Sequence, residues 1–553
     1  MHAPTIDRPL PPSAARPRGR LRAPAWTVQV ALYGLILAAC WVRAGWLPST
    51  PGTMGRDESR LALAALGILE HGIPHLPDGF VYTRGLLPAY LEAASIALLG
   101  FTDQAARLPS LIFGTLLVPA TFALGRLAGP PWAALAAAAI VAFSPPLVLQ
   151  AREAWLYSSL LFWFAIALAW LLRDGPGDRW RAGLAAVAAL LSHELAVLLV
   201  PIAALLDLAR VAGPRRRAEA PAWRRVVPFW ALLLGGVALV GALSLALRAP
   251  TAGGPTVELR EYLRPPADLL GLRLTLAHFG GWHAWLLPAA VLGLPYTRRG
   301  LRAALARPER LAAPVAVLAV ILFNAFGLVM RGESRYALLA LPPLAVAATT
   351  GLARVGPSLV AALGGLALGG SALVAATNAG AAHGPSMLGV GRLGRGAHVL
   401  VGGGLLLALV ALSVDPARLL AEARARDLAE TWVQSLADRR PDDLVMSFAP
   451  TLTMRYLGRT DFWLRSEGYE KYVWANRRVL RDVHTGAVVV RNAAELESLV
   501  ARQNRGSTLW VVLAIDPSRE TSRPTREVGA ALLARAAEVR RPPDGRVVLR
   551  VVL

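Results

Sequence analysis

The sequence predicts an α-helical polytopic membrane protein that ends in a small soluble α/β domain. Of its 553 residues, 55% are hydrophobic and 17% are charged, and the mean hydropathy is +0.47. Soluble domains are less apolar than this. The Gly and Pro residues are scattered among long Ala, Leu and Val runs rather than set in a three-residue period. This spacing excludes collagen-like and low-complexity disordered chains.

Apolar runs of about twenty residues are long enough to cross a bilayer, and we expect about 11–13 transmembrane helices. The sequence offers twelve candidate spans, at residues 26–43, 104–125, 130–149, 155–172, 181–193, 195–210, 226–247, 281–296, 312–330, 336–353, 356–377 and 397–413. Arginine clusters set the orientation because basic loops stay in the cytoplasm. Arg126 and the arginine clusters of 173–181, 210–225 and 298–310 all fall on the N-terminal side.

Three regions follow from this topology. Residues 1–25 form a cytoplasmic N-terminal tail, and residues 26–413 form a transmembrane domain whose large first outer loop spans 44–103. Two stretches of that loop have helical periodicity and predict amphipathic helices at the interface. Residues 414–553 form the soluble domain, with a helical pattern at 417–438 and strand-like runs at 488–490, 509–515 and 547–553. Twelve spans would return this domain to the cytoplasm, whereas eleven or thirteen would place it outside.

The formal charge of +22 does not require nucleic acid as a partner. Lys471 is the sole lysine, so the basic residues are almost all arginine. Their excess lies in loops between apolar runs, where positive-inside topology accounts for it. A single cysteine, Cys40, excludes an intramolecular disulfide. We find no Walker loop, C-x-x-C, H-E-x-x-H, G-x-S-x-G or D-x-D motif, so no nucleotide cofactor is expected.

Asp57 and Glu58 are the leading candidates for catalysis, because they are adjacent carboxylates just beyond the first span. A general base belongs there if the chemistry occurs at the membrane surface. The alternative is a helix start, in which Asp57 caps backbone N–H groups and Glu58 favours the helix dipole. Two adjacent carboxylates can also bind a divalent cation, so the sequence does not decide whether the protein requires a metal ion. Arg84, beside Tyr82, suits bidentate phosphate recognition or binding of lipid headgroups.

Further polar residues fall on the predicted outer face. Two arginines in a five-residue outer turn would neutralise a departing phosphate, because outer loops should otherwise be poor in arginine. His193-Glu194 is either an outer turn or a functional pair. Arg152 and Glu153 face the outer cavity or form a local ion pair. The full set of these outer candidates is Tyr82, Arg152, Glu153, His193, Glu194, His283, Arg331, Glu333, Arg335 and Tyr336.

The order of these pieces resembles the polytopic GT-C glycosyltransferases, which include protein O-mannosyltransferases, aminoarabinose transferases and bacterial family 39 enzymes. The resemblance covers roughly residues 26–350. Its carriers are Asp57-Glu58, the stretches 69–74, 82–90, 99–101 and 105–110, and Arg335-Tyr336 before Leu341-Pro342. The chain departs from the family by having Arg84 where aminoarabinose transferases have lysine, and Arg152-Glu153 where a plain aspartate is usual.

The resemblance implies a GT-C-like fold and Asp57, with Glu58, as catalytic carboxylates. It also implies that Arg84, Arg331, Arg335 and Tyr336 bind the donor phosphate, and that the sugar is transferred with inversion. The expected partners are a polyprenyl-phosphate-linked sugar, a glycan, lipid or protein acceptor and membrane lipid. The expected location is a bacterial plasma membrane, with the active site outside. A transporter, or an envelope glycan ligase that uses a diphosphate-linked donor, is the alternative.

Overall fold

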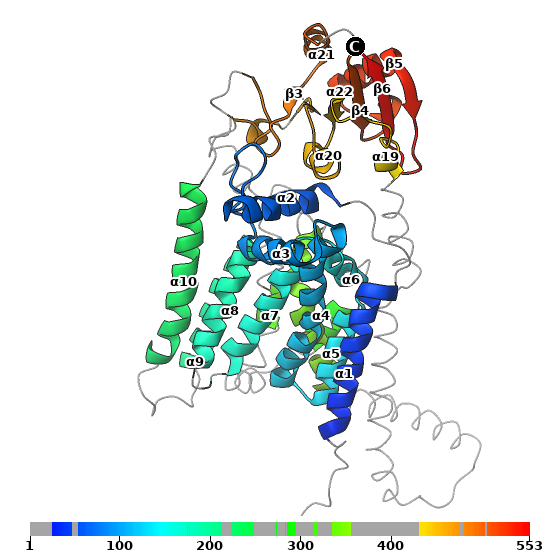
Figure 1. The fold of residues 1–553 in the computed structure, drawn as a ribbon. Helices are drawn as coiled ribbons and strands as arrows, with labels where there is room; N and C mark the ends of the chain where they lie inside the picture. The colour runs from blue at the N-terminus through cyan, green and yellow to red at the C-terminus, as the bar shows by residue number, and fades with distance from the viewer. Residues whose placement is uncertain are drawn as a thin grey trace, which may run out of the picture.

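A helical bundle carries a smaller α/β domain on one of its ends (Figure 1). The computed structural model describes residues 25–46, 54–173, 175, 177–212, 223–247, 273, 283, 285–292, 294, 314–318, 334–354, 431–467, 469–474, 479–503 and 506–553. The candidate spans at 356–377 and 397–413, and most of the one at 312–330, lie outside these residues, whereas the one at 281–296 is described in part. Most of the helical pattern at 417–438 also lies outside the described residues.

The helices of the bundle follow the predicted spans. They are α1 (Ala25–Trp41), followed by the π-helical turn Val42–Trp46, α4 (Asp103–Ala128), α5 (Pro131–Phe143), α6 (Pro145–Ala151), α7 (Tyr157–Arg173), α8 (Asp178–Ser192), the 3₁₀ turn Glu194–Leu198, α9 (Leu199–Ala212), α10 (Trp223–Ala246), α13 (Leu286–Leu292) and the 3₁₀ turn Ser334–Ala340, which leads into a helix to residue 354. Among the described residues, four helices are long and apolar enough to cross a membrane, or five if α5 and α6 form one bent span.

The first outer loop contains two further helices, α2 (Arg56–His71) and α3 (Leu86–Leu99), as its periodicity predicts. They lie across the upper end of the bundle rather than along it (Figure 1). Gly72 ends α2 in a left-handed conformation, with φ at +78°, which a glycine adopts without steric cost. The loop thus forms a platform between the bundle and the C-terminal domain.

The C-terminal domain is built on one mixed sheet of six strands, in the order β3-β2-β1-β4-β6-β5. Strands β3, β2, β1 and β4 are parallel, and β6 pairs antiparallel with both β4 and β5. The strands are β1 (Leu444–Ser447), β2 (Phe462–Leu464), β3 (Val488–Val490), β4 (Thr508–Leu513), β5 (Ala536–Arg540) and β6 (Val547–Val552). The helical segments are α19 (Thr431–Gln434), α20 (Pro450–Leu457), α21 (Ala493–Val500), α22 (Arg523–Arg535) and the 3₁₀ turns η8 (Glu470–Tyr472) and η9 (Pro517–Arg519).

The domain docks on the first outer loop. The Tyr456 hydroxyl accepts a hydrogen bond from the Met54 amide at 2.7 Å, and Arg455 pairs with Asp103 at 2.9 Å. The loop that follows the first span and the tail therefore lie on the same side of the membrane.

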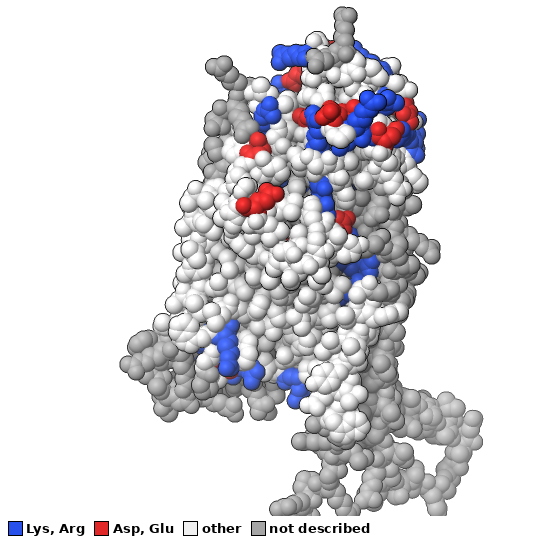
Figure 2. Space-filling view, in the orientation of Figure 1, with Lys and Arg blue, Asp and Glu red and all other residues white. Residues whose placement is uncertain are grey.

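Charged side chains gather at the two ends of the molecule and leave a pale band over the helices between them (Figure 2). At the end away from the platform, Arg179 and Arg210 both pair with Asp207, at 2.6 and 3.0 Å. These arginines belong to clusters that the positive-inside rule assigns to the N-terminal side. Asp207 therefore balances part of the positive charge of the described residues at this end.

Candidate active site

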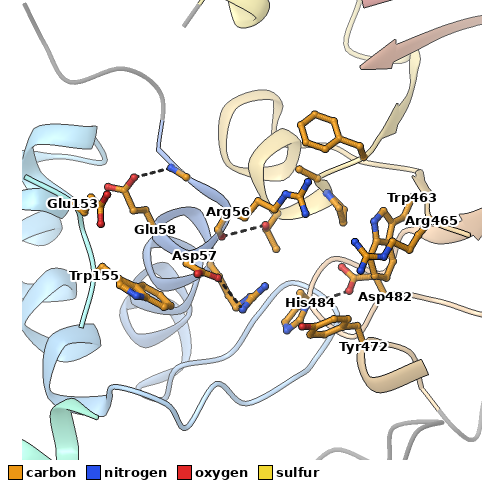
Figure 3. Close-up of a pocket in the computed structure, with 16 residues that line it drawn as sticks. Arg56, Asp57, Glu58, Glu153, Trp155, Trp463, Arg465, Tyr472, Asp482 and His484 are labelled. Atoms are coloured by element: carbon orange, nitrogen blue, oxygen red, sulfur yellow. Dashed lines mark hydrogen bonds and ion pairs between the residues drawn. The ribbon is translucent and has the colours of Figure 1, made fainter. Parts of the chain in front are cut away.

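A cavity of about 450 Å³ lies between the start of α2 and the C-terminal domain (Figure 3). Its lining includes residues from the outer loop, from the segment after α6 and from the C-terminal domain. These residues are Gly55, Arg56, Asp57, Glu58, Arg60, Glu153, Trp155, Phe448, Ala449, Pro450, Thr451, Trp463, Arg465, Tyr472, Asp482 and His484. Ligand pockets in proteins have volumes of this order. Three segments far apart in sequence thus build one site.

Asp57 lies on the wall that α2 gives to this cavity, and its side chain is 37% exposed. The helix begins at Arg56, which places Asp57 in its first turn, where the positive end of the helix dipole stabilises a carboxylate. Arg60, one turn later, forms an ion pair with Asp57 at 3.5 Å. The carboxylate is therefore held in position while it stays open to the cavity.

Glu58, and not Asp57, makes the capping contact at the start of α2, where Gly55 is the N-cap residue. Its Oε2 accepts from the Gly55 amide at 2.7 Å, which completes the N-terminal turn of α2. Its Oε1 accepts from Arg107 of α4 at 3.1 Å and from the Ala154 amide at 2.8 Å. The two adjacent carboxylates consequently have different surroundings, since Glu58 is buried in a network and Asp57 faces the cavity.

Three arginines, Arg56, Arg60 and Arg465, line this cavity together with four carboxylates. Arg56 stacks over the Phe448 ring at 4.9 Å, and Arg465 lines the cavity from the C-terminal domain. Burial lowers the pKa of Arg56, and the like charge of Arg465 lowers it further. Arginines placed in this way stabilise negative charge that develops beside them.

Arg84 belongs to a second cluster at the same end of the bundle. It pairs with Glu194 at 2.6 Å and contacts Nε2 of His193 at 3.1 Å. The His193 ring packs near Tyr157 and Tyr336, with ring centroids 5.3 and 6.4 Å away. Burial acts to raise the pKa of Glu194, but His193 and Arg84 outweigh it and lower that pKa to about 2. His193 and Glu194 lie where α8 ends and the 3₁₀ turn Glu194–Leu198 begins.

The remaining residues predicted from the sequence lie at different places in the structure. Arg152 donates to the Arg43 carbonyl at 3.0 Å, and Glu153 lines the cavity while it accepts from Gln150 at 2.7 Å. The buried His283 lies 3.0 Å from the Ser144 hydroxyl, away from the residues that line the cavity. Arg331 and Glu333 lie outside the described residues, as does the side chain of Arg335.

Comparisons with known proteins bear on the whole arrangement. No family model matches the sequence, and no curated protein matches it significantly. Among solved structures, ArnT from Cupriavidus metallidurans bound to undecaprenyl phosphate aligns with 16% identity over 95% of this chain and 98% of its own, with a TM-score of 0.58. The chain has the GT-C fold. The oligosaccharyltransferase AglB from Archaeoglobus fulgidus, in complex with an inhibitory peptide and a dolichol-phosphate, aligns with 13% identity over 94% of this chain and 74% of its own, with a TM-score of 0.53.

Within this GT-C fold, sequence reasoning missed the residues that the C-terminal domain gives to the cavity. Trp463, Arg465, Tyr472, Asp482 and His484 are the main ones. Among the expected elements of this domain, none included the Asp482-Val483-His484-Thr485-Gly486 run. Its buried polar residues were the available signal. In the part of the chain that the structure describes, no group of three or more His, Cys, Asp or Glu side chains is placed to hold a metal ion.

Proposed function

We propose that the protein is an integral-membrane glycosyltransferase that moves a sugar from a polyprenyl-phosphate carrier to an acceptor hydroxyl. The single observation that carries the proposal is the position of Asp57. It lies at the platform end of an apolar bundle, in a cavity that two domains line and to which three arginines contribute. The similarity to GT-C structures supports the same chemistry, because ArnT was solved with undecaprenyl phosphate and AglB with a dolichol-phosphate.

In the proposed reaction, Asp57 takes the proton of the acceptor hydroxyl, whose oxygen attacks the anomeric carbon. The new glycosidic bond forms as the bond from that carbon to the carrier phosphate breaks, and the electron pair leaves with the phosphate. One displacement of this kind inverts the anomeric configuration. A positioned carboxylate contributes roughly 10²–10⁴-fold as a general base. Glu58 acts as a positioning residue, because its three contacts fix the turn that carries Asp57.

Arg84 is proposed to bind the leaving phosphate together with Tyr336, Arg331 and Arg335. Its guanidinium already holds a carboxylate, that of Glu194, and the same planar fork fits a phosphate. The donor would therefore compete with Glu194 for this arginine. Its lipid tail would lie among the apolar helices while the sugar reaches the cavity. The arginine-rich loops assigned to the opposite end support a location of this face outside the cytoplasm.

The test compares wild type with Asp57→Asn, using purified full-length protein, radiolabelled polyprenyl-phosphate monosaccharides and membrane extract as acceptor. We expect transfer by wild type and a loss of at least about 100-fold in the variant. Glu70→Gln, at the far end of the same helix, is the matched control and should keep full activity. Unchanged transfer by a folded Asp57→Asn protein would refute the role of Asp57.

An envelope ligase with an oligosaccharide donor is the second candidate. The observation in its favour is that the alignment with AglB, an oligosaccharyltransferase, covers 94% of this chain. A polyprenyl-diphosphate oligosaccharide in the same assay separates the two, since a ligase would use it and reject the monophosphate donors. A transporter is less consistent with the structure, because transporter sites lie near mid-membrane and the described cavity lies at one end of the bundle.

A further inference from the structure

The C-terminal domain presents the carboxyl ends of its parallel strands to the cavity. Phe448, Ala449 and Pro450 follow β1 directly, and Arg465 follows β2. The strand order changes direction beside β1, because the chain continues from β1 to β2 and β3 on one side and returns to β4 on the other. In open α/β sheets, ligands bind outside the carboxyl ends of the strands at such a point. This wall of the cavity therefore has the architecture of a binding site.

His484 occupies that wall in a fixed orientation. Its Nδ1 lies 3.1 Å from Oδ1 of the buried Asp482, whose other oxygen accepts from the Thr485 hydroxyl at 2.7 Å and from the Thr485 amide at 3.1 Å. The rings of Phe80 and Tyr472 pack against the imidazole, with centroids 5.3 and 5.8 Å away. Figure 3 shows His484 on the same wall as Tyr472, Asp482 and Trp463. The ring has little freedom to rotate.

The other ring nitrogen, Nε2, is the free acceptor of this arrangement. Within the described residues Nε2 forms no hydrogen bond, and His484 lines the cavity. Burial and the positive charge of Arg60 lower the pKa of His484, although Asp482 and Asp57 oppose this effect. The imidazole is therefore neutral at pH 7, with its proton on Nδ1 toward Asp482. Its lone pair on Nε2 can accept one hydrogen bond from a ligand.

Aromatic side chains surround this acceptor. Phe448, Trp463 and Tyr472 line the cavity from the C-terminal domain, and Trp155 lines it from the bundle. Aromatic faces bury the apolar C–H faces of a sugar ring, while its hydroxyls need fixed donors and acceptors. Arg56 and Arg465 supply donors, and His484 supplies the acceptor. Neither a lipid chain nor a simple serine side chain would use all of these groups.

We propose that the acceptor substrate is a glycan, and that His484 is a specificity-determining residue that accepts a hydrogen bond from a second, non-reacting hydroxyl of that glycan. Asp482 is the positioning residue for His484. The inference rests on the proposed function, because Asp57 is taken to act on the reacting hydroxyl in the same cavity. It adds the substrate class, which the fold alone does not give.

The first experiment does not depend on transfer. Diethylpyrocarbonate modifies neutral imidazoles, and mass spectrometry of the full-length protein in nanodiscs locates the modified histidines. We expect His484 to react, and oligosaccharides released from the envelope of the source organism to slow its modification at least fivefold. Ser/Thr peptides and a lipid extract are the rival ligands. Equal modification with and without the oligosaccharides, or protection by a rival ligand alone, would overturn the proposal.

The second experiment measures transfer from the radiolabelled polyprenyl-phosphate monosaccharide as the oligosaccharide concentration varies. His484→Phe keeps a flat ring but no acceptor, and we expect it to raise the half-saturating oligosaccharide concentration at least tenfold while that of the donor stays within twofold. His484→Gln keeps an acceptor oxygen and should recover part of the loss. Wild-type saturation by His484→Phe, or an equal change for both substrates, would contradict the assignment.

The two experiments separate the two proposals. If wild type transfers sugar from no donor while the oligosaccharides still protect His484, the glycan site stands and the glycosyltransferase reaction is rejected. If transfer occurs to peptides or lipids and the oligosaccharides give no protection, the reaction stands and the glycan site is rejected. Thermal unfolding of each variant confirms that the substituted proteins are folded.

Discussion

Glu58 of α2 and Arg107 of α4 form an ion pair 3.1 Å long, and both side chains are at most 10% exposed. The pair joins the platform helix that carries Asp57 to a helix of the bundle. Glu58 also accepts hydrogen bonds from the Gly55 and Ala154 amides. One side chain therefore holds together the turn before α2, the bundle and the segment after α6.

We predict that Glu58→Gln destabilises the protein by about 3 kcal/mol, because it leaves the Arg107 charge buried without its counter-ion. Thermal unfolding in detergent measures the change. The double variant Glu58→Gln/Arg107→Met should recover part of the loss, since it removes the uncompensated charge. Glu70→Gln, on the exposed end of the same helix, is the control and should unfold like wild type. A Glu58→Gln protein as stable as wild type would contradict this account of the pair.

The pair of Glu194 with Arg84 predicts a dependence of stability on acid. The folded-state pKa of Glu194 is about 2, below its ordinary value of 4.5, so the folded protein binds fewer protons than the unfolded chain between these values. The contribution of Glu194 to stability is thus complete above about pH 4.5 and is lost as the pH falls toward 2. Glu194→Gln should lower the unfolding temperature at pH 7, and its difference from wild type should shrink from pH 4.5 downward.

The control repeats this comparison in a protein that carries Arg84→Gln, because Arg84 and His193 together lower the pKa of Glu194. In that background the effect of Glu194→Gln should be smaller at pH 7. A difference between wild type and Glu194→Gln that stays constant from pH 7 to pH 3 would show that the carboxylate is not held ionised by its neighbours.

The docking of the C-terminal domain depends on Arg455. Its guanidinium lies 3.6 Å from the centroid of the Phe101 ring and 2.9 Å from Asp103, and its side chain is 8% exposed. We predict that Arg455→Met loosens the contact by about 2 kcal/mol or more, because the charge-assisted hydrogen bond is lost and Asp103 stays largely buried. Hydrogen exchange in α20 should speed up, and transfer should fall as the cavity opens.

An exposed ion pair of the same domain gives the matched control. Arg523 and Glu527 are 82% and 53% exposed, so Arg523→Met should cost less than about 0.5 kcal/mol and leave exchange in α20 unchanged. Equal effects of the two substitutions would mean that Arg455 has no special part in docking.

Local patterns in the sequence predicted the parts of the fold that local physics determines. Apolar length predicted the spans, and helical periodicity predicted α2 and α3 in the outer loop. The carboxylates Asp57 and Glu58 were recognisable because they follow the first span. The sequence could not show which of the two carboxylates contacts the start of the helix. Gly55 takes the cap position, and Glu58 is held by contacts with α4 and the Ala154 amide, which are distant in sequence.

Long-range contacts explain what the sequence left open. Tyr456 and Met54 are 402 residues apart, yet their hydrogen bond joins the C-terminal domain to the first outer loop. Strands β1 and β2 are only four and three residues long, too short for a recognisable alternation. The half of the cavity that contains His484 depends on this docking, so no motif within the first 350 residues could have indicated it.

Gly67 of α2 shows how closely the platform is packed, and it gives the last prediction. A Cβ at this position would lie 1.9 Å from the carbonyl oxygen of His75, which belongs to the backbone and cannot rotate away. We predict that Gly67→Ala destabilises the protein by about 1–3 kcal/mol, because α2 or the segment around His75 must shift. Gly34→Ala on α1 is the matched control, since nothing lies within 4 Å of its Cβ. The measurement is the unfolding temperature of each variant relative to wild type. The control should keep or exceed wild-type stability because alanine favours helix, and equal stability of the two variants would contradict the close approach of α2 to His75.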